Sequence, residues 1–189
     1  MQKVYILHGI CEEEEYYSND YPSSSNSHWM PWLQKQLMTA GYNCQTPEVP
    51  MAYKGRWEDW GGTISKLDIN DNTILIGHSC GCGAFLKYIA QNQTIKLDKL
   101  ILVAPYIDPD KDYGDLLNFE LDSNLFNQVN SIHLIKSDDE PLASVNKTTA
   151  MLKQAYPDLQ YTEVKGYGHC TLFAMQTEEF PELLEVVKK

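Results

Sequence analysis

The serine at position 79 is the residue whose surroundings most clearly indicate chemistry. It lies in Gly77-His78-Ser79-Cys80-Gly81, directly after the apolar run 73–76 and before a stretch with helical spacing. Glycines at 77 and 81 allow a tight turn between a strand and a helix that larger side chains would obstruct. Such a turn holds a hydroxyl out above a sheet, so the pattern predicts that Ser79 is a nucleophile.

A serine hydroxyl becomes an effective nucleophile when a histidine takes its proton and a carboxylate orients that histidine. His169 follows the last predicted strand in a loop that begins at Gly166 and contains Gly168, and it is the predicted base. The other four histidines occupy positions that suit structural roles, because they end a strand, begin a helix, precede the serine or lie within a strand: His8, His28, His78 and His133.

The acid is expected in a cluster of carboxylates that follows the preceding strand. Asp138, Asp139 and Glu140 stand together ahead of Pro141, so the chain order is nucleophile, acid, base. That order is one of those in which a serine triad occurs. Three adjacent acids leave the choice ambiguous, and we expect Asp139, with Asp138 as the alternative.

The reaction also needs two backbone N–H groups aimed at the negative charge that develops on the substrate oxygen. One is typically the amide of the residue after the nucleophile, which is Cys80. The other should come from the loop after the first strand, where Gly9 makes the backbone flexible. We expect the Ile10 amide there, ahead of that of Cys11.

Composition and charge exclude several classes of protein. The 189 residues are 43% apolar without low-complexity tracts, which predicts one globular domain over residues 1–189. No apolar stretch is long enough for a signal peptide or a membrane span, so a cytoplasmic location is expected. The net charge of −11 argues against nucleic acid and anionic membranes as partners.

The cysteines and glycines give no sign of a metal or cofactor. Five cysteines at irregular spacing are expected to be reduced thiols, and their spacing matches no recognised set of metal ligands. The glycines around Ser79 lack the lysine that a phosphate-binding loop requires. We therefore expect no metal and no cofactor.

Strand and helix patterns alternate along the chain. Strands are predicted at about 3–8, 42–46, 73–76, 99–104, 132–136 and 160–164, and helices at about 28–40, 56–67, after Ser79, at 143–156 and around 180–187. A possible short helix lies around Leu116 and Leu125 in the acidic segment 106–127. This alternation is typical of an α/β fold with a parallel sheet, in which reactive residues gather beyond the carboxyl ends of the strands.

The sequence resembles the small α/β-hydrolase family of retinoblastoma-binding protein 9 and YdeN-like serine hydrolases over almost its entire length. The residues that carry the resemblance include His8-Gly9, Ile76–Gly81, Ser137-Asp138-Asp139 and Gly168-His169. The resemblance implies a three-layer α/β-hydrolase fold with a minimal sheet of about six strands, helices on both faces and little or no cap. It also implies Ser79 as nucleophile, His169 as base and Asp139 as acid.

These expectations combine into a serine hydrolase that cleaves small carboxylic esters, or amides, through an acyl-enzyme. Two alternatives stay open: an aminopeptidase-like activity on short substrates, and a non-catalytic interaction module that retains the fold. Segments 10–27 and 106–127 each carry a net charge of −5 and are expected to border the mouth of the site. Such a mouth would favour neutral or cationic substrates, although acidic loops equally serve solubility.

Overall fold

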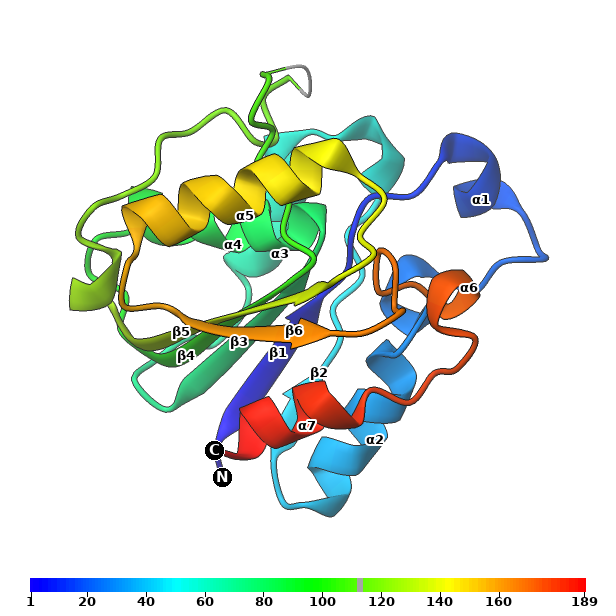
Figure 1. Cartoon of the computed structure of the whole chain (residues 1–189), viewed down its shortest axis with the longest axis horizontal. Helices are drawn as coiled ribbons and strands as arrows, with labels where there is room; N and C mark the ends of the chain where they lie inside the picture. The colour runs from blue at the N-terminus through cyan, green and yellow to red at the C-terminus, as the bar shows by residue number, and fades with distance from the viewer. Residues whose placement is uncertain (112–113) are drawn as a thin grey trace.

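A parallel six-stranded sheet forms the centre of the molecule in the computed structural model, which describes residues 1–111 and 114–189 (Figure 1). The strand order is β2-β1-β3-β4-β5-β6, and every pairing is parallel. The strands are β1 Lys3–Leu7, β2 Asn43–Gln45, β3 Thr73–His78, β4 Leu97–Val103, β5 Val129–Ser137 and β6 Gln160–Val164. The predicted α/β architecture with about six strands is confirmed.

Helices cover both faces of the sheet. On one face lie α3 Trp57–Ile64, α4 Cys80–Gln91 and α5 Ala143–Ala155, and on the other lie α2 Met30–Thr39 and α7 Pro181–Lys188 (Figure 1). The shorter elements are α1 Glu13–Tyr17, α6 Leu172–Met175 and the 3-10 turns η1 Ser24–Asn26, η2 Ala52–Lys54 and η3 Leu125–Asn127.

The middle strands of the sheet contain continuous apolar runs because both of their faces are covered. In β4, Leu100 and Leu102 pack into the core beneath α3 and α4, whereas Ile101 and Val103 pack into the core beneath α2 and α7. All six residues of β3 are buried, including the terminal His78. The apolar run before Ser79 is therefore a strand buried on both faces, as its composition indicates.

Three segments differ from the sequence prediction. Helix α2 begins at Met30, so His28 lies outside it with a backbone φ of 60°. Residues 10–27 contain α1, which the sequence did not predict because none of its residues is buried. Helix α6 was also missed, since a helix of four residues is too short for a hydrophobic period to show.

The acidic segment 106–127 lies on the α3–α4–α5 face of the molecule. Leu116, Leu117 and Leu125 are buried in the core there, and η3 corresponds to the short helix predicted around Leu125. Asp112, one of the acidic residues of the segment, is outside the described residues. Among the described helices, none has both the length and the hydropathy needed to cross a membrane.

Helix α4 starts very close to the ends of β1 and β3, and two glycines make this approach possible. A methyl group added to Gly81 would overlap the carbonyl oxygens of Leu7 and His8. One added to Gly77 would lie 2.6 Å from the Cys82 nitrogen. These clashes are with backbone atoms, which cannot rotate away, so the corner between β3 and α4 requires glycine at both positions.

We predict that Gly81→Ala lowers the free energy of unfolding by about 1–3 kcal/mol, because α4 must move away from β1. Gly62→Ala in α3 is the matched control, since an added methyl there would have no neighbour within 4 Å. It should leave stability unchanged or raise it by up to about 1 kcal/mol. Urea unfolding followed by circular dichroism measures both, and equal midpoints for the two variants would contradict the prediction.

Candidate active site

Ser79 occupies the corner between β3 and α4 with φ 52° and ψ −120°. A side chain in this region of backbone space is strained, and it persists only where the surroundings hold it. Here the Ser79 amide donates to the Val103 carbonyl at 3.0 Å, and the Ser79 carbonyl accepts from the Cys82 and Tyr106 amides at 3.1 Å each. Bonds to the end of β4 and to α4 therefore fix the serine in place.

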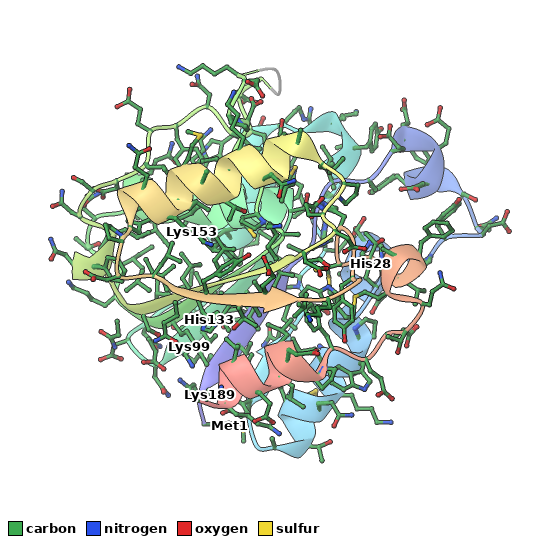
Figure 2. All side chains as sticks on the ribbon, in the orientation of Figure 1. Met1, His28, Lys99, His133, Lys153 and Lys189 are labelled. Atoms are coloured by element: carbon green, nitrogen blue, oxygen red, sulfur yellow. The ribbon has the colours of Figure 1, made fainter. Side chains whose placement is uncertain are left out.

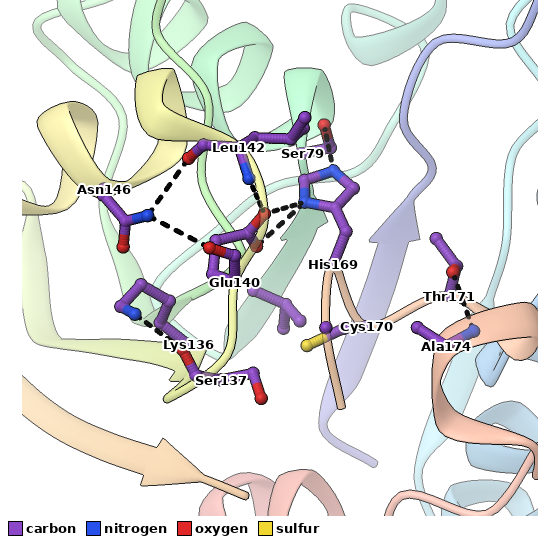
Figure 3. Close-up of polar contacts among 12 residues, drawn as sticks. Ser79, Lys136, Ser137, Glu140, Leu142, Asn146, His169, Cys170, Thr171 and Ala174 are labelled. Atoms are coloured by element: carbon purple, nitrogen blue, oxygen red, sulfur yellow. Dashed lines mark hydrogen bonds and ion pairs between the residues drawn. The ribbon is translucent and has the colours of Figure 1, made fainter. Parts of the chain in front are cut away.

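His169 links the serine to a buried carboxylate (Figure 3). Its Nε2 lies 3.0 Å from Ser79 Oγ, and its Nδ1 lies 3.0 and 3.2 Å from the two oxygens of Glu140. The Glu140 side chain is completely shielded from solvent, and one of its oxygens also accepts from the Leu142 amide at 3.0 Å. A proton on Nδ1 faces the carboxylate, which leaves Nε2 free to accept the serine proton.

The structure places neither Asp139 nor Asp138 beside His169, unlike the sequence-based expectation, and the carboxylate next to His169 Nδ1 is that of Glu140. The Asp139 carboxylate accepts from the Gly168 amide at 2.8 Å and from Ser137 Oγ at 2.5 Å. These two hydrogen bonds hold the pKa of Asp139 below its usual value. Asp138 accepts from the Gly166 amide at 3.0 Å.

Ser137, Asp138 and Asp139 together hold the backbone of the loop that carries His169. Ser137 Oγ accepts from the Tyr167 amide at 2.9 Å, so these three consecutive side chains accept from the three consecutive amides of residues 166–168. Glu140 is one residue further along and one methylene longer than aspartate. It passes this backbone and reaches the imidazole, which the clustering of acids in the sequence could not reveal.

The carbonyls of the same loop are held from the opposite side. His78 Nε2 donates to the His169 carbonyl at 2.9 Å, and Trp29 Nε1 donates to the Cys170 carbonyl at 3.1 Å. Gly166, Gly168 and Cys170 all have positive φ, which makes the loop tight enough for these contacts. The position of the imidazole is therefore set by hydrogen bonds to its own backbone as well as by Glu140.

The two predicted oxyanion donors lie beside the serine. Cys80 is the first residue of α4, where an amide has no acceptor within its own helix. Gly9 lies against Ser79, since a methyl group added to it would be 3.1 Å from the Ser79 Cβ. Burial raises the pKa of the Cys80 thiol to about 12, and a hydrogen bond from the Ile10 amide partly opposes this rise. Ile10 therefore lies beside Cys80, the residue that follows the serine.

A cavity of about 930 Å³ opens beside Ser79 and His169. Its lining includes much of the stretch 9–28, with Glu15, Tyr16 and Tyr21, and the segment around α6, with Leu172 and Phe173. Segment 106–127 was expected at this mouth, but none of its described residues lines this cavity. Its leucines pack into the core on the α3–α4–α5 face, and its described residues line most of a separate cavity of about 650 Å³.

The cavity wall contains residues that the sequence analysis set aside. His8, His28 and His78 all line it, and so does Glu48. Burial lowers the pKa of each of these histidines, to about 4 for His28, so all three are neutral at neutral pH. His8 ends a predicted strand and His78 precedes the serine, which suggests structural roles, whereas His28 and Glu48 are far from Ser79 in the sequence and reach its cavity only in the folded chain.

No group of metal-ligating side chains that could hold an ion occurs in the described part of the chain. Its cysteines are free thiols, and four of them are buried: Cys44, Cys80, Cys82 and Cys170. Burial raises the pKa of the Cys170 thiol to about 12. These thiols are protonated at neutral pH and act as small apolar side chains.

Comparison with known proteins identifies the family of this chain. The model of the serine hydrolase family matches residues 19–189. The chain belongs to the serine hydrolase family. It is 28% identical to serine hydrolase RBBP9 of Rattus norvegicus over 172 residues, which cover 85% of this chain and 84% of the relative.

Similarity to YdeN of Bacillus subtilis is seen in sequence and in structure. The sequences are 35% identical over 108 residues, which cover 56% of this chain and about half (51%) of that protein. The crystal structure of YdeN superposes with a TM-score of 0.82 at 25% identity, covering 100% of this chain and 97% of that one. The predicted α/β-hydrolase fold and the resemblance to YdeN-like serine hydrolases are confirmed.

The geometry predicts unequal effects for two near-isosteric substitutions. Glu140→Gln removes the charge that faces His169 Nδ1, and the rate of Ser79 labelling by a fluorophosphonate should fall about a thousandfold or more. Asp139→Asn keeps an oxygen that can accept from the Gly168 amide, and its labelling rate should stay within about tenfold of wild type. A loss in Asp139→Asn as large as that in Glu140→Gln would contradict the assignment of the acid.

Proposed function

We propose that this protein is an esterase that hydrolyses small carboxylic esters, and activated amides more slowly, through an acyl-enzyme. The observation that supports this most directly is the chain of hydrogen bonds from Ser79 Oγ through His169 to the buried Glu140. The triad of the proposal is Ser79, His169 and Glu140, with glutamate in place of the predicted aspartate.

In the proposed mechanism, Ser79 Oγ attacks the acyl carbonyl while His169 Nε2 takes the hydroxyl proton. Glu140 stabilises the imidazolium that results. The amides of Ile10 and Cys80 donate to the oxyanion of the tetrahedral intermediate. His169 then returns the proton to the leaving alkoxide, which departs as the alcohol and leaves an acyl-serine.

The second half of the reaction regenerates the serine. Water enters from the cavity, gives a proton to His169 Nε2 and attacks the acyl-serine carbonyl. Collapse of this intermediate releases the carboxylic acid and returns the proton to Ser79 Oγ. The cavity of about 930 Å³ beside the serine is of the size found for small-molecule sites, which supports small esters as substrates.

A fluorophosphonate probe tests the proposal. We expect wild-type protein to be labelled, and Ser79→Ala to show no labelling although it folds normally, because the probe reacts with an activated serine. The same pair should differ in hydrolysis of p-nitrophenyl butyrate. A folded wild-type protein that neither labels nor hydrolyses esters would overturn the esterase proposal and favour a module that uses the cleft for docking.

The charge of the cavity supports a preference among esters. Glu15 and Glu48 lie in its lining, and no lysine or arginine occurs among the described lining residues. The four lining histidines add no fixed positive charge when they are neutral. A negative wall repels anionic substrates and attracts cationic ones, which also keeps short substrates with a free amino group as a second candidate class.

We predict that wild-type kcat/KM at low salt is about tenfold lower for the p-nitrophenyl half-ester of a dicarboxylic acid than for its methylated, neutral counterpart. The difference should shrink in high salt and in Glu15→Gln, which removes one of the charges. Comparing the ratio between wild type and variant cancels the intrinsic reactivity of the two esters. A ratio that responds neither to salt nor to the variant would exclude the electrostatic preference.

A further inference from the structure

His28 stands in the cavity wall in a conformation that the local sequence does not require. It precedes α2 with φ 60°, a region that side chains rarely adopt outside functional or tightly held sites. The next residue, Trp29, is fully buried and donates to the Cys170 carbonyl, which holds the backbone at this point. His28 itself lies beside α6 (Figure 2), and it lines the same cavity as Ser79.

The hydrogen bonding of His28 defines where its proton lies. The Leu172 amide, at the start of α6, donates to His28 Nδ1 at 3.2 Å. Because a nitrogen that accepts a hydrogen bond carries no proton, the proton of the neutral ring is on Nε2. Within the described residues, no acceptor takes a hydrogen bond from this Nε2–H.

Three hydroxyls of the same wall make hydrogen bonds within the protein. The hydroxyl of Ser23 accepts from the Asn26 side chain at 2.8 Å, and that of Ser27 donates to the Ser23 carbonyl at 3.1 Å. Thr171 Oγ accepts from the Ala174 amide at 3.3 Å. His28 differs from these rotatable hydroxyls because the bond from the Leu172 amide to Nδ1 holds its ring, so its Nε2–H is an oriented donor available to an external acceptor.

His28 is far enough from Ser79 and His169 to contact a part of the substrate away from the scissile bond. The ring of His28 packs edge-on against that of His78, with centroids 5.6 Å apart, and His78 lies 5.3 Å from His169. His28 is therefore one imidazole removed from the base. A group bound there would be several bonds from the scissile carbonyl.

We propose that His28 is a substrate-binding residue whose Nε2–H donates to an ether or carbonyl oxygen of the substrate, away from the scissile bond. This inference rests on the proposed esterase function and narrows it to esters that carry a second oxygen acceptor. A polar donor fixed in a partly apolar cavity discriminates against an analogue without the matching acceptor, because the donor is then left unpaired.

Two variants separate substrate binding from the contact with α6. His28→Asn retains a side-chain oxygen near the position of Nδ1, which can accept from the Leu172 amide, but it places no donor at the position of Nε2. His28→Gln places an amide donor near the position of Nε2 and gives up the acceptor for Leu172. A structural role predicts that the first variant behaves like wild type, whereas a binding role predicts that the second does.

The kinetic test uses isosteric esters, such as p-nitrophenyl 4-methoxybutanoate and p-nitrophenyl hexanoate, over a series of chain lengths. A parallel series of butyrate esters carries the ether oxygen in the alcohol. We expect the ratio of kcat/KM for ether over alkyl ester to fall about fivefold in His28→Asn and to be retained in His28→Gln, in one of the two series. Effects common to both esters cancel in this ratio.

The tautomer provides a readout besides activity. Nitrogen-15 spectra of the histidine-labelled full chain should show an unprotonated Nδ1 and a protonated Nε2 at His28, and the Nε2 signal should shift when the ether substrate is added to Ser79→Ala. A proton on Nδ1, or an equal ester ratio in wild type and His28→Asn in both series, overturns the inference alone. Failure of wild type to hydrolyse any ester overturns the proposed function, and this inference with it.

Discussion

The bonds between the ends of β5 and β6 are the constraint on which the site depends. The parallel ladder pairs Ser137 with Val164, and the Asp138 amide still donates to the Val164 carbonyl at 2.9 Å. Beyond that point the backbones separate, and side chains take over: Ser137, Asp138 and Asp139 accept from the amides of residues 166–168. These side-chain bonds continue the pairing of the two segments beyond the ends of the strands. His169 follows directly after the last of the bonded amides and lies opposite Glu140.

Hydrogen bonds beyond the end of a strand also fix the serine, at the centre of the sheet. Its amide and carbonyl bond to the chain around the end of β4, while Gly77 and Gly81 let α4 approach β1 and β3. Serine and histidine are thus anchored to different strands of one sheet, and the bond from His78 to the His169 carbonyl connects the two anchors directly. Ser79 Oγ lies 3.0 Å from His169 Nε2, and the hydrogen bonds that hold the two backbones help to set this distance.

The parts of this arrangement that are local in sequence could be predicted, and the parts that depend on distant contacts could not. The apolar strand before Ser79 and the glycines around it specify the corner through their own sterics, and the same holds for the loop at His169. The choice among Asp138, Asp139 and Glu140 is decided by amides nearly thirty residues further along the chain. His28 could not be recognised for the same reason, since only the folded chain brings it to the cavity that contains Ser79.

The two walls of the cavity differ in how freely they can change. Helix α6 begins three residues after His169, and Cys170 between them has a positive φ, so insertions or large side chains there would displace His169. The wall at 10–27 contains α1, none of whose residues is buried, and its contacts include the hydrogen bond from the Met51 amide to the Tyr16 hydroxyl. New substrate preferences can therefore arise by altering the wall at 10–27, whereas alterations in α6 would change preference and turnover together.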